Sequence, residues 1–128
     1  MTNNKVRIKT FTPMTDQCFL IMTTVPDQAT AETIAQRLVD GGHAACVTIG
    51  APVLSLYHWR GKTETAPEIP VSIKTAARCY DAVESVLLEL HPYELPEIIA
   101  LPIAAGLPAY LDWITAASVR SAENRNEA

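Results

Sequence analysis

Hydrophobic and polar positions alternate along residues 44–75 in a pattern that predicts one long β-hairpin. The first arm, residues 44–59, is rich in β-branched and aromatic residues, as strands prefer, and pauses at residues 50–52. The return arm, residues 69–75, alternates apolar and polar residues, so one of its faces points inward. Between the arms, Gly61 can adopt the positive φ that a tight turn needs. A hairpin of this length overhangs a small core, which favours pairing of the overhang with another chain.

The rest of the apolar pattern predicts two more strands and three helices. A nearly continuous apolar run suits a strand that is covered on both faces, and apolar residues spaced three and four apart suit amphipathic helices. Asp27 is the expected N-cap of the first helix, and Gly41 is its expected stop. The predicted elements are a strand at residues 18–25, a helix at 27–40, a helix that opens at Thr75 or Ala76 and ends near 91, a strand at 97–101 and a helix that begins near Pro108.

This order of elements predicts an α+β fold, namely a ferredoxin-like βαββαβ sandwich with an extended central hairpin and an extra C-terminal helix. We expect the helices on one face of the sheet and, because the strands are apolar, a partner subunit on the other. With 128 residues the chain is long enough for one domain and too short for two ordinary ones. We place the domain at residues 17–120, with a partly disordered N-terminal extension at 1–16 and a frayed C-terminal tail at 121–128.

Charge and cysteine content exclude several classes of protein. The net charge of −4 argues against a nucleic-acid partner, which requires clustered basic residues. The three cysteines are widely spaced and include no CxxC pair, which argues against a disulfide framework or a zinc knuckle and indicates a reducing compartment. The first 17 residues contain no apolar segment typical of a signal peptide, and no later segment is long enough to cross a membrane. We therefore expect a cytoplasmic protein with no membrane partner.

The usual enzyme signatures are missing. The sequence contains no Ser/His/Asp set, no glycine-rich phosphate loop and no HExxH motif. An enzyme would have only Lys74, Tyr93 and Glu97 as candidate groups, and their nearness in sequence is the sole argument for them. We therefore expect no enzymatic activity.

Metal binding has better candidates. Residues 91–97 bring an imidazole, a phenol and two carboxylates close together in a loop that two prolines hold rigid. His91 and Glu97 form a ligand pair that suits zinc or copper. The alternative is that His91 caps the C-terminus of the preceding helix. Cys46 lies among small residues in a strand, where a thiol is either an inert small hydrophobe or a metal or redox group.

The hairpin carries a second group of candidates. Tyr57 and Trp59 combine apolar rings with polar edges, and Lys74 lies on the return arm. These side chains suit either the packing of an interface or a pocket where two chains meet.

Five short strings in the chain occur in order and at ordinary spacing. They are AACV at 44–47, SxYxWxGK at 55–62, KT at 74–75, HPYxxPEI at 91–98 and YLxW at 110–113. Together they resemble the CutA divalent-cation tolerance proteins over about residues 17–120. The resemblance implies a ferredoxin-like subunit in a tight homotrimer, with the long hairpin clasping its neighbours and clefts between subunits. It also implies a role in tolerance of copper or other divalent metals, without an established catalytic activity.

Two features depart from the family pattern. Some members have a cysteine at the position of Thr23 and a second histidine at that of Leu90, which would make a soft copper site. Of that set only His91 is present here. Pro70 stands where most members have an ordinary apolar residue, and it lacks the backbone donor of a strand, so we expect a local bulge or an unpaired edge.

Two hypotheses about function follow. The first is a homotrimer that binds a divalent metal ion, copper first, and no organic cofactor. Its candidate ligands are His91, Cys46 and Glu97. The alternative is a trimer that senses a small molecule or an anion in the cleft between subunits. Its candidate residues are Tyr57, Trp59, Lys62 and Lys74.

Overall fold

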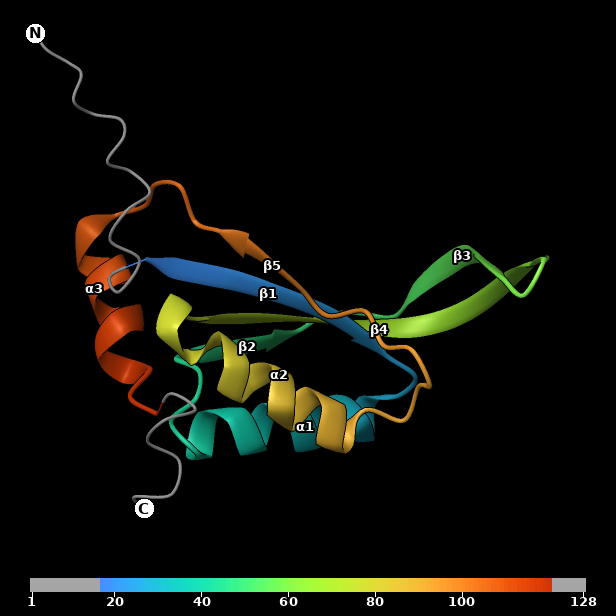
Figure 1. Cartoon of the computed structure of the whole chain (residues 1–128), viewed down its shortest axis with the longest axis horizontal. Helices are drawn as coiled ribbons and strands as arrows, with labels where there is room; N and C mark the ends of the chain where they lie inside the picture. Colours follow the sequence, from blue (N-terminus) through green and yellow to red (C-terminus); the bar gives the residue numbers. More distant parts are fainter. Residues whose placement is uncertain (1–16, 121–128) are drawn as a thin grey trace, which may run out of the picture.

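The computed structural model describes residues 17–120, so the predicted N-terminal extension and C-terminal tail lie outside the described residues. The chain forms an antiparallel sheet with α1 and α2 on one face and α3 at one end (Figure 1). The predicted α+β fold, with its extended hairpin and extra C-terminal helix, is confirmed. None of the helices within this range is long and apolar enough to span a membrane. The elements are β1 Cys18–Val25, α1 Gln28–Asp40, β2 Cys46–Ile49, β3 Val53–Trp59, β4 Lys62–Ala76, a 3-10 turn Ala77–Cys79, α2 Tyr80–Leu90, β5 Ile99–Pro102 and α3 Pro108–Ala117.

The sheet is organised around β4, its longest strand. The strand order is β2-β4-β1-β5, and β3 pairs with the part of β4 that extends past β2. Every pair of neighbouring strands is antiparallel. Strands β3 and β4 project from the body as a two-stranded arm (Figure 1). The predicted overhang of the hairpin is therefore present.

The core lies between the sheet and the two helices. Ile21 of β1 and Ile73 of β4 are fully buried, and they pack with Ile34 and Leu38 of α1 and Leu87 of α2. Alternate residues of the same strands point to the opposite face. The period-two pattern of the sequence thus decides which side chains enter the core.

Helix α1 begins and ends where the sequence predicts. The Asp27 carboxylate accepts the N–H of Thr30 at 2.8 Å, as an N-cap does. At the other end, the N–H of Gly41 donates to the Arg37 carbonyl, and Gly42 takes a φ of 75°. A left-handed glycine of this kind is the common end of a helix.

The hairpin is interrupted opposite Pro70, which confirms the bulge predicted there. Residues 50–52 lie between β2 and β3 and face only residues 69–70 of β4. One strand therefore carries an extra residue, as in a β-bulge. Gly50 closes the gap by donating its N–H to the Pro70 carbonyl at 2.9 Å.

The tip of the hairpin is a two-residue turn. Arg60 has a φ of 52° and Gly61 a φ of 82°, so both central residues are left-handed. Turns of this mirror-image type match the natural twist of paired strands. The predicted positive φ at Gly61 is confirmed, and Arg60 adopts the same region without the freedom of a glycine.

The second helix begins later than predicted. We expected it to open at Thr75 or Ala76, but β4 continues to Ala76 and a 3-10 turn, Ala77–Cys79, precedes α2. Tertiary contacts hold these residues in the sheet. Thr75 pairs with Phe19, and its hydroxyl donates to the His43 carbonyl at 2.7 Å.

The predicted bounds of the last strand also need correction. The last strand, β5, begins at Ile99 rather than at residue 97, and it includes Pro102. Proline is tolerated because β5 is an edge strand, which needs no donor on its outer side. Within one chain β1 is covered on one face only, so the predicted cover of its second face depends on the partner subunit. Leu20 and Met22 are only half-buried, because α1 and α2 pack on the other face.

Candidate functional site

One face of the sheet, which we call the open face, carries no helix. Its side chains alternate with the buried residues of β1, β2, β4 and β5, and the apolar ones among them remain accessible. Ile99 and Leu101 of β5 are 48% and 45% exposed. The open-face residues are Leu20, Met22, Thr24, Cys46, Thr48, Glu68, Pro70, Ser72, Lys74, Ile99 and Leu101.

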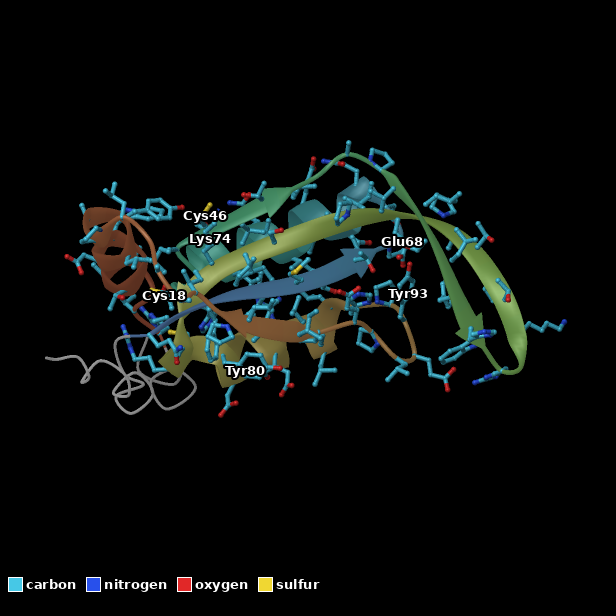
Figure 2. The ribbon with its side chains drawn as sticks, turned by 90° about the horizontal axis from the view of Figure 1, so that it is seen from above. Cys18, Cys46, Glu68, Lys74, Tyr80 and Tyr93 are labelled. Atoms are coloured by element: carbon cyan, nitrogen blue, oxygen red, sulfur yellow. The ribbon has the colours of Figure 1, made fainter. Side chains whose placement is uncertain are left out.

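Glu68 is the charged residue that is buried at the base of the projecting arm. Its side chain is 7% exposed, and one carboxylate oxygen accepts the Tyr93 hydroxyl at 2.8 Å. The hydroxyl-bearing side chains of Ser55 and Thr24 also form hydrogen bonds with this carboxylate. Figure 2 shows Glu68 and Tyr93 facing each other at the end of the sheet opposite Cys46. Residues from β1, β3, β4 and the α2–β5 loop therefore meet at a single carboxylate.

The surroundings of Glu68 decide its charge and that of its partner. Burial raises the pKa of Glu68. Hydrogen bonds from Ser55, Tyr93 and Thr24 together lower it by more than burial raises it, so the pKa falls below its usual 4.5. Burial, together with the hydrogen bond to Glu68, raises the pKa of Tyr93 well above its usual 10. The pair is thus an ionised acceptor and a neutral donor at neutral pH.

His91 holds the adjoining loop in place. The imidazole Nδ1 accepts the N–H of Tyr93 at 3.3 Å, so Nε2 carries the proton and donates it to the Thr24 carbonyl at 2.8 Å. The ring is 8% exposed. The His91 backbone N–H continues α2 by donating to the Leu87 carbonyl. Both ring nitrogens are therefore engaged with the backbone in this arrangement.

The three candidate metal ligands do not come together within one chain. Cys46 pairs with Lys74, whereas His91 bonds to Thr24, which lies opposite Pro70. Those two positions are four residues apart on β4, or about 13 Å along the strand. Glu97 is exposed in the α2–β5 loop.

A copper ion needs several soft or borderline donors around one point. Within residues 17–120 there is no group of three or more His, Cys, Asp or Glu side chains that could hold a metal ion. The donors of a single chain therefore do not fit a copper ion.

The four candidate cleft residues are also spread out. Tyr57, Trp59 and Lys62 lie along the projecting arm, where Tyr57 pairs with Glu64 and Trp59 pairs with Lys62. Lys74 is at the other end of β4, twelve residues and roughly 40 Å along the strand from Lys62. A pocket that contains all four residues would require more than one chain.

Arg60, at the tip of the arm, connects it to the α2–β5 loop. Its guanidinium lies 5.2 Å from the centre of the Trp59 ring and 2.9 Å from the Glu94 carboxylate. Both partners in the ion pair are largely exposed, so its contribution to stability is small.

Reasoning from the sequence missed Glu68, Ser55 and Thr24 as parts of one site. The available signal was an acidic residue at the start of the apolar return arm, directly before Ile69. That signal predicts an edge or a turn as readily as a buried carboxylate. The hydroxyl donors come from positions 13 and 44 residues away, which no local pattern connects.

Comparisons with known proteins agree with this architecture. A family model described as the CutA1 divalent ion tolerance protein matches residues 19–117. The divalent-cation tolerance protein CutA of Thermus thermophilus is 40% identical over 95 residues, which is 74% of this chain and 92% of that protein. The crystal structure of CutA from Xylella fastidiosa has a TM-score of 0.76 and 46% identity, covering 78% of this chain and 96% of that one. CutA1 from Oryza sativa has a TM-score of 0.80 and 33% identity, covering 84% and 99%. With the family model spanning nearly all the described residues, this chain belongs to the CutA1 divalent ion tolerance family.

Proposed function

We propose that this chain acts in divalent-cation tolerance as a cytoplasmic homotrimer that binds a divalent metal ion, copper first, between its copies. The name shared by its relatives supports a role in cation tolerance. The proposed ligands are those predicted from the sequence, Cys46, His91 and Glu97, and metal binding would require His91 to give up one of its two backbone hydrogen bonds. Cys46 pairs with Lys74, and His91 bonds to Thr24, which lies opposite Pro70, so the positions on β4 that these two ligands adjoin are about 13 Å apart. The proposed ligand set therefore takes donors from different copies. The proposal includes no enzymatic step.

The open face is the observation that most strongly supports the proposed trimer. Ile99, Leu101 and half-buried Leu20 and Met22 form an apolar sheet face with no helix over it. Large exposed apolar areas of this kind mark protein interfaces. The projecting arm adds to the argument, because a lone two-stranded ribbon is only marginally stable in water.

The arm itself is poorly covered in one chain. Leu54 and Leu56 of β3 are 64% and 65% exposed. Pairing or packing of β3 against a neighbouring copy would remove this apolar surface from water. Self-association thus accounts for both the open face and the length of the arm.

Sedimentation in dilute buffer tests the assembly. We expect a particle with three times the 13.9 kDa mass of one chain. A folded monomer at micromolar concentration would refute the trimer and, with it, any site between copies.

Calorimetric titration with Cu²⁺ and Zn²⁺ tests the ligands. We expect the double variant Cys46→Ala, His91→Ala to bind copper at least tenfold more weakly than the natural chain, and Glu97→Gln to show a smaller loss. His58→Ala, which removes an exposed imidazole on the arm, is the matched control and should bind normally. Equal affinity in the double variant and the natural chain would show that these residues do not hold the metal.

A further inference from the structure

Glu68 is a buried anion that forms no ion pair with a Lys or Arg side chain in residues 17–120. The two ion pairs in this range, Arg37 with Glu89 and Arg60 with Glu94, lie elsewhere. The His91 imidazole helps to lower the pKa of Glu68, but its ring nitrogens bond to backbone groups and form no ion pair with this carboxylate. The hydrogen bonds of Glu68 keep its carboxylate ionised, and no Lys or Arg of residues 17–120 neutralises it, so it can attract a cation from another copy.

The Glu68 carboxylate also has room for one more donor. Its two oxygens offer about four acceptor positions. The hydroxyl groups of Tyr93, Ser55 and Thr24 account for three of them. Glu68 lies at an open-face position, where no helix covers the sheet, and 7% of the residue is exposed.

Lys74 is the complementary charge on the same face of the same strand. Its side chain is half-buried, and its cross-strand neighbours Cys46 and Leu20 carry no carboxylate. The ammonium forms no hydrogen bond or ion pair with any residue that the structure describes. Six residues of β4, roughly 20 Å along the strand, separate it from Glu68. The two unmatched charges therefore cannot meet within one chain (Figure 2).

We propose that the Lys74 ammonium of one copy pairs with the Glu68 carboxylate of the next copy, so that each binding interface contains one such pair. The inference rests on the homotrimer proposed above and assigns residues to its contact. A contact between two different parts of the same surface is head-to-tail, and when the rotation between copies is one third of a turn such contacts close into a three-membered ring in which every copy uses both parts. On its open face each copy offers one unmatched cation, Lys74, and one unmatched anion, Glu68, so a closed ring leaves neither of them unpaired.

A double-mutant cycle on assembly tests this pair. The variants are Lys74→Met, Glu68→Gln and the two combined, and the readout is the trimer dissociation constant from sedimentation over a dilution series. Removal of one partner of a buried pair leaves the other charge uncompensated, so each single variant should weaken assembly tenfold or more. The double variant should be no weaker than the worse single variant. Arg37→Met, which removes a cation from α1 on the helix-covered side, is the matched control and should assemble normally.

The outcomes separate this inference from the trimer itself. A monomeric natural chain would overturn both. The pair alone is overturned if the natural chain is a trimer and Lys74→Met assembles equally well. The same holds if the dissociation constant of the double variant rises by the product of the two single effects. If circular dichroism shows that Glu68→Gln is unfolded, the Lys74 variants decide alone. In that case Lys74→Arg should retain assembly and Lys74→Met should lose it, and equal assembly of the two would refute the pair.

Discussion

Replacement of Thr23 by valine is expected to stabilise the protein. Thr23 lies in the middle of β1, points to the helices and is 2% exposed. Its Oγ1 is the one buried side-chain polar atom in residues 17–120 that has no hydrogen-bond partner. Valine has nearly the same shape and the same β-branch, so the change removes the hydroxyl and leaves the packing intact.

The magnitude follows from the missing partner. A buried polar group without a hydrogen bond costs about 1–3 kcal/mol in desolvation. We expect Thr23→Val to raise the free energy of unfolding by about 1 kcal/mol, the lower end of that range. For a domain of about 100 residues this corresponds to a rise of roughly 4 °C or more in melting temperature.

Thr75 provides a matched control on the neighbouring strand. It is also fully buried and β-branched, but its hydroxyl donates to the His43 carbonyl at 2.7 Å. Thr75→Val leaves that carbonyl without its partner, so we expect a loss of about 1–2 kcal/mol. The same chemical change should therefore have opposite signs at the two positions.

Urea unfolding at a fixed protein concentration measures both variants, and unchanged m-values would show that the compactness of the unfolded state has not altered. The reasoning is refuted if Thr23→Val is less stable than the natural chain by more than about 0.5 kcal/mol, the usual range of neutral substitutions. It also fails if the two valine variants change stability in the same direction.

Three further predictions concern the base and the tip of the arm. Tyr93→Phe removes the hydrogen bond to Glu68 and should cost about 1.5–3 kcal/mol at pH 7. Because folding lowers the pKa of Glu68, this contribution is present above pH 4.5 and is lost as the pH falls through the folded value, so urea midpoints of the natural chain and Tyr93→Phe should converge on acidification. Gly61→Ala has open space for its methyl group, so its cost should be the left-handed backbone alone, about 1–2 kcal/mol. Gly50→Ala should destabilise by steric contact instead, because its Cβ would lie 2.9 Å from the Pro70 ring. Thermal melts compare the two alanine variants, and a fully stable Gly61→Ala would contradict the turn geometry.

Local chemistry was sufficient for the kind and order of the elements, and short sequence strings were sufficient for the family. The period of two in residues 69–75 predicts the return arm because a strand alternates its faces whatever surrounds it. The N-cap at Asp27 and the turn at Gly61 follow from backbone preferences of single residues, and both are present. The bulge at Pro70 follows in the same way from a missing donor.

Only the tertiary structure decided where α2 begins and which groups form a site. Thr75 stays in β4 because its partners, Phe19 and the His43 carbonyl, come from distant parts of the chain. The same holds for Glu68. Its buried carboxylate is stabilised in the ionised form by a hydrogen bond from the hydroxyl of Tyr93, 25 residues away. A sequence shows which side chains can donate, accept or carry charge. Burial and partnership depend on distances between segments, and these are set only when the strands and helices pack.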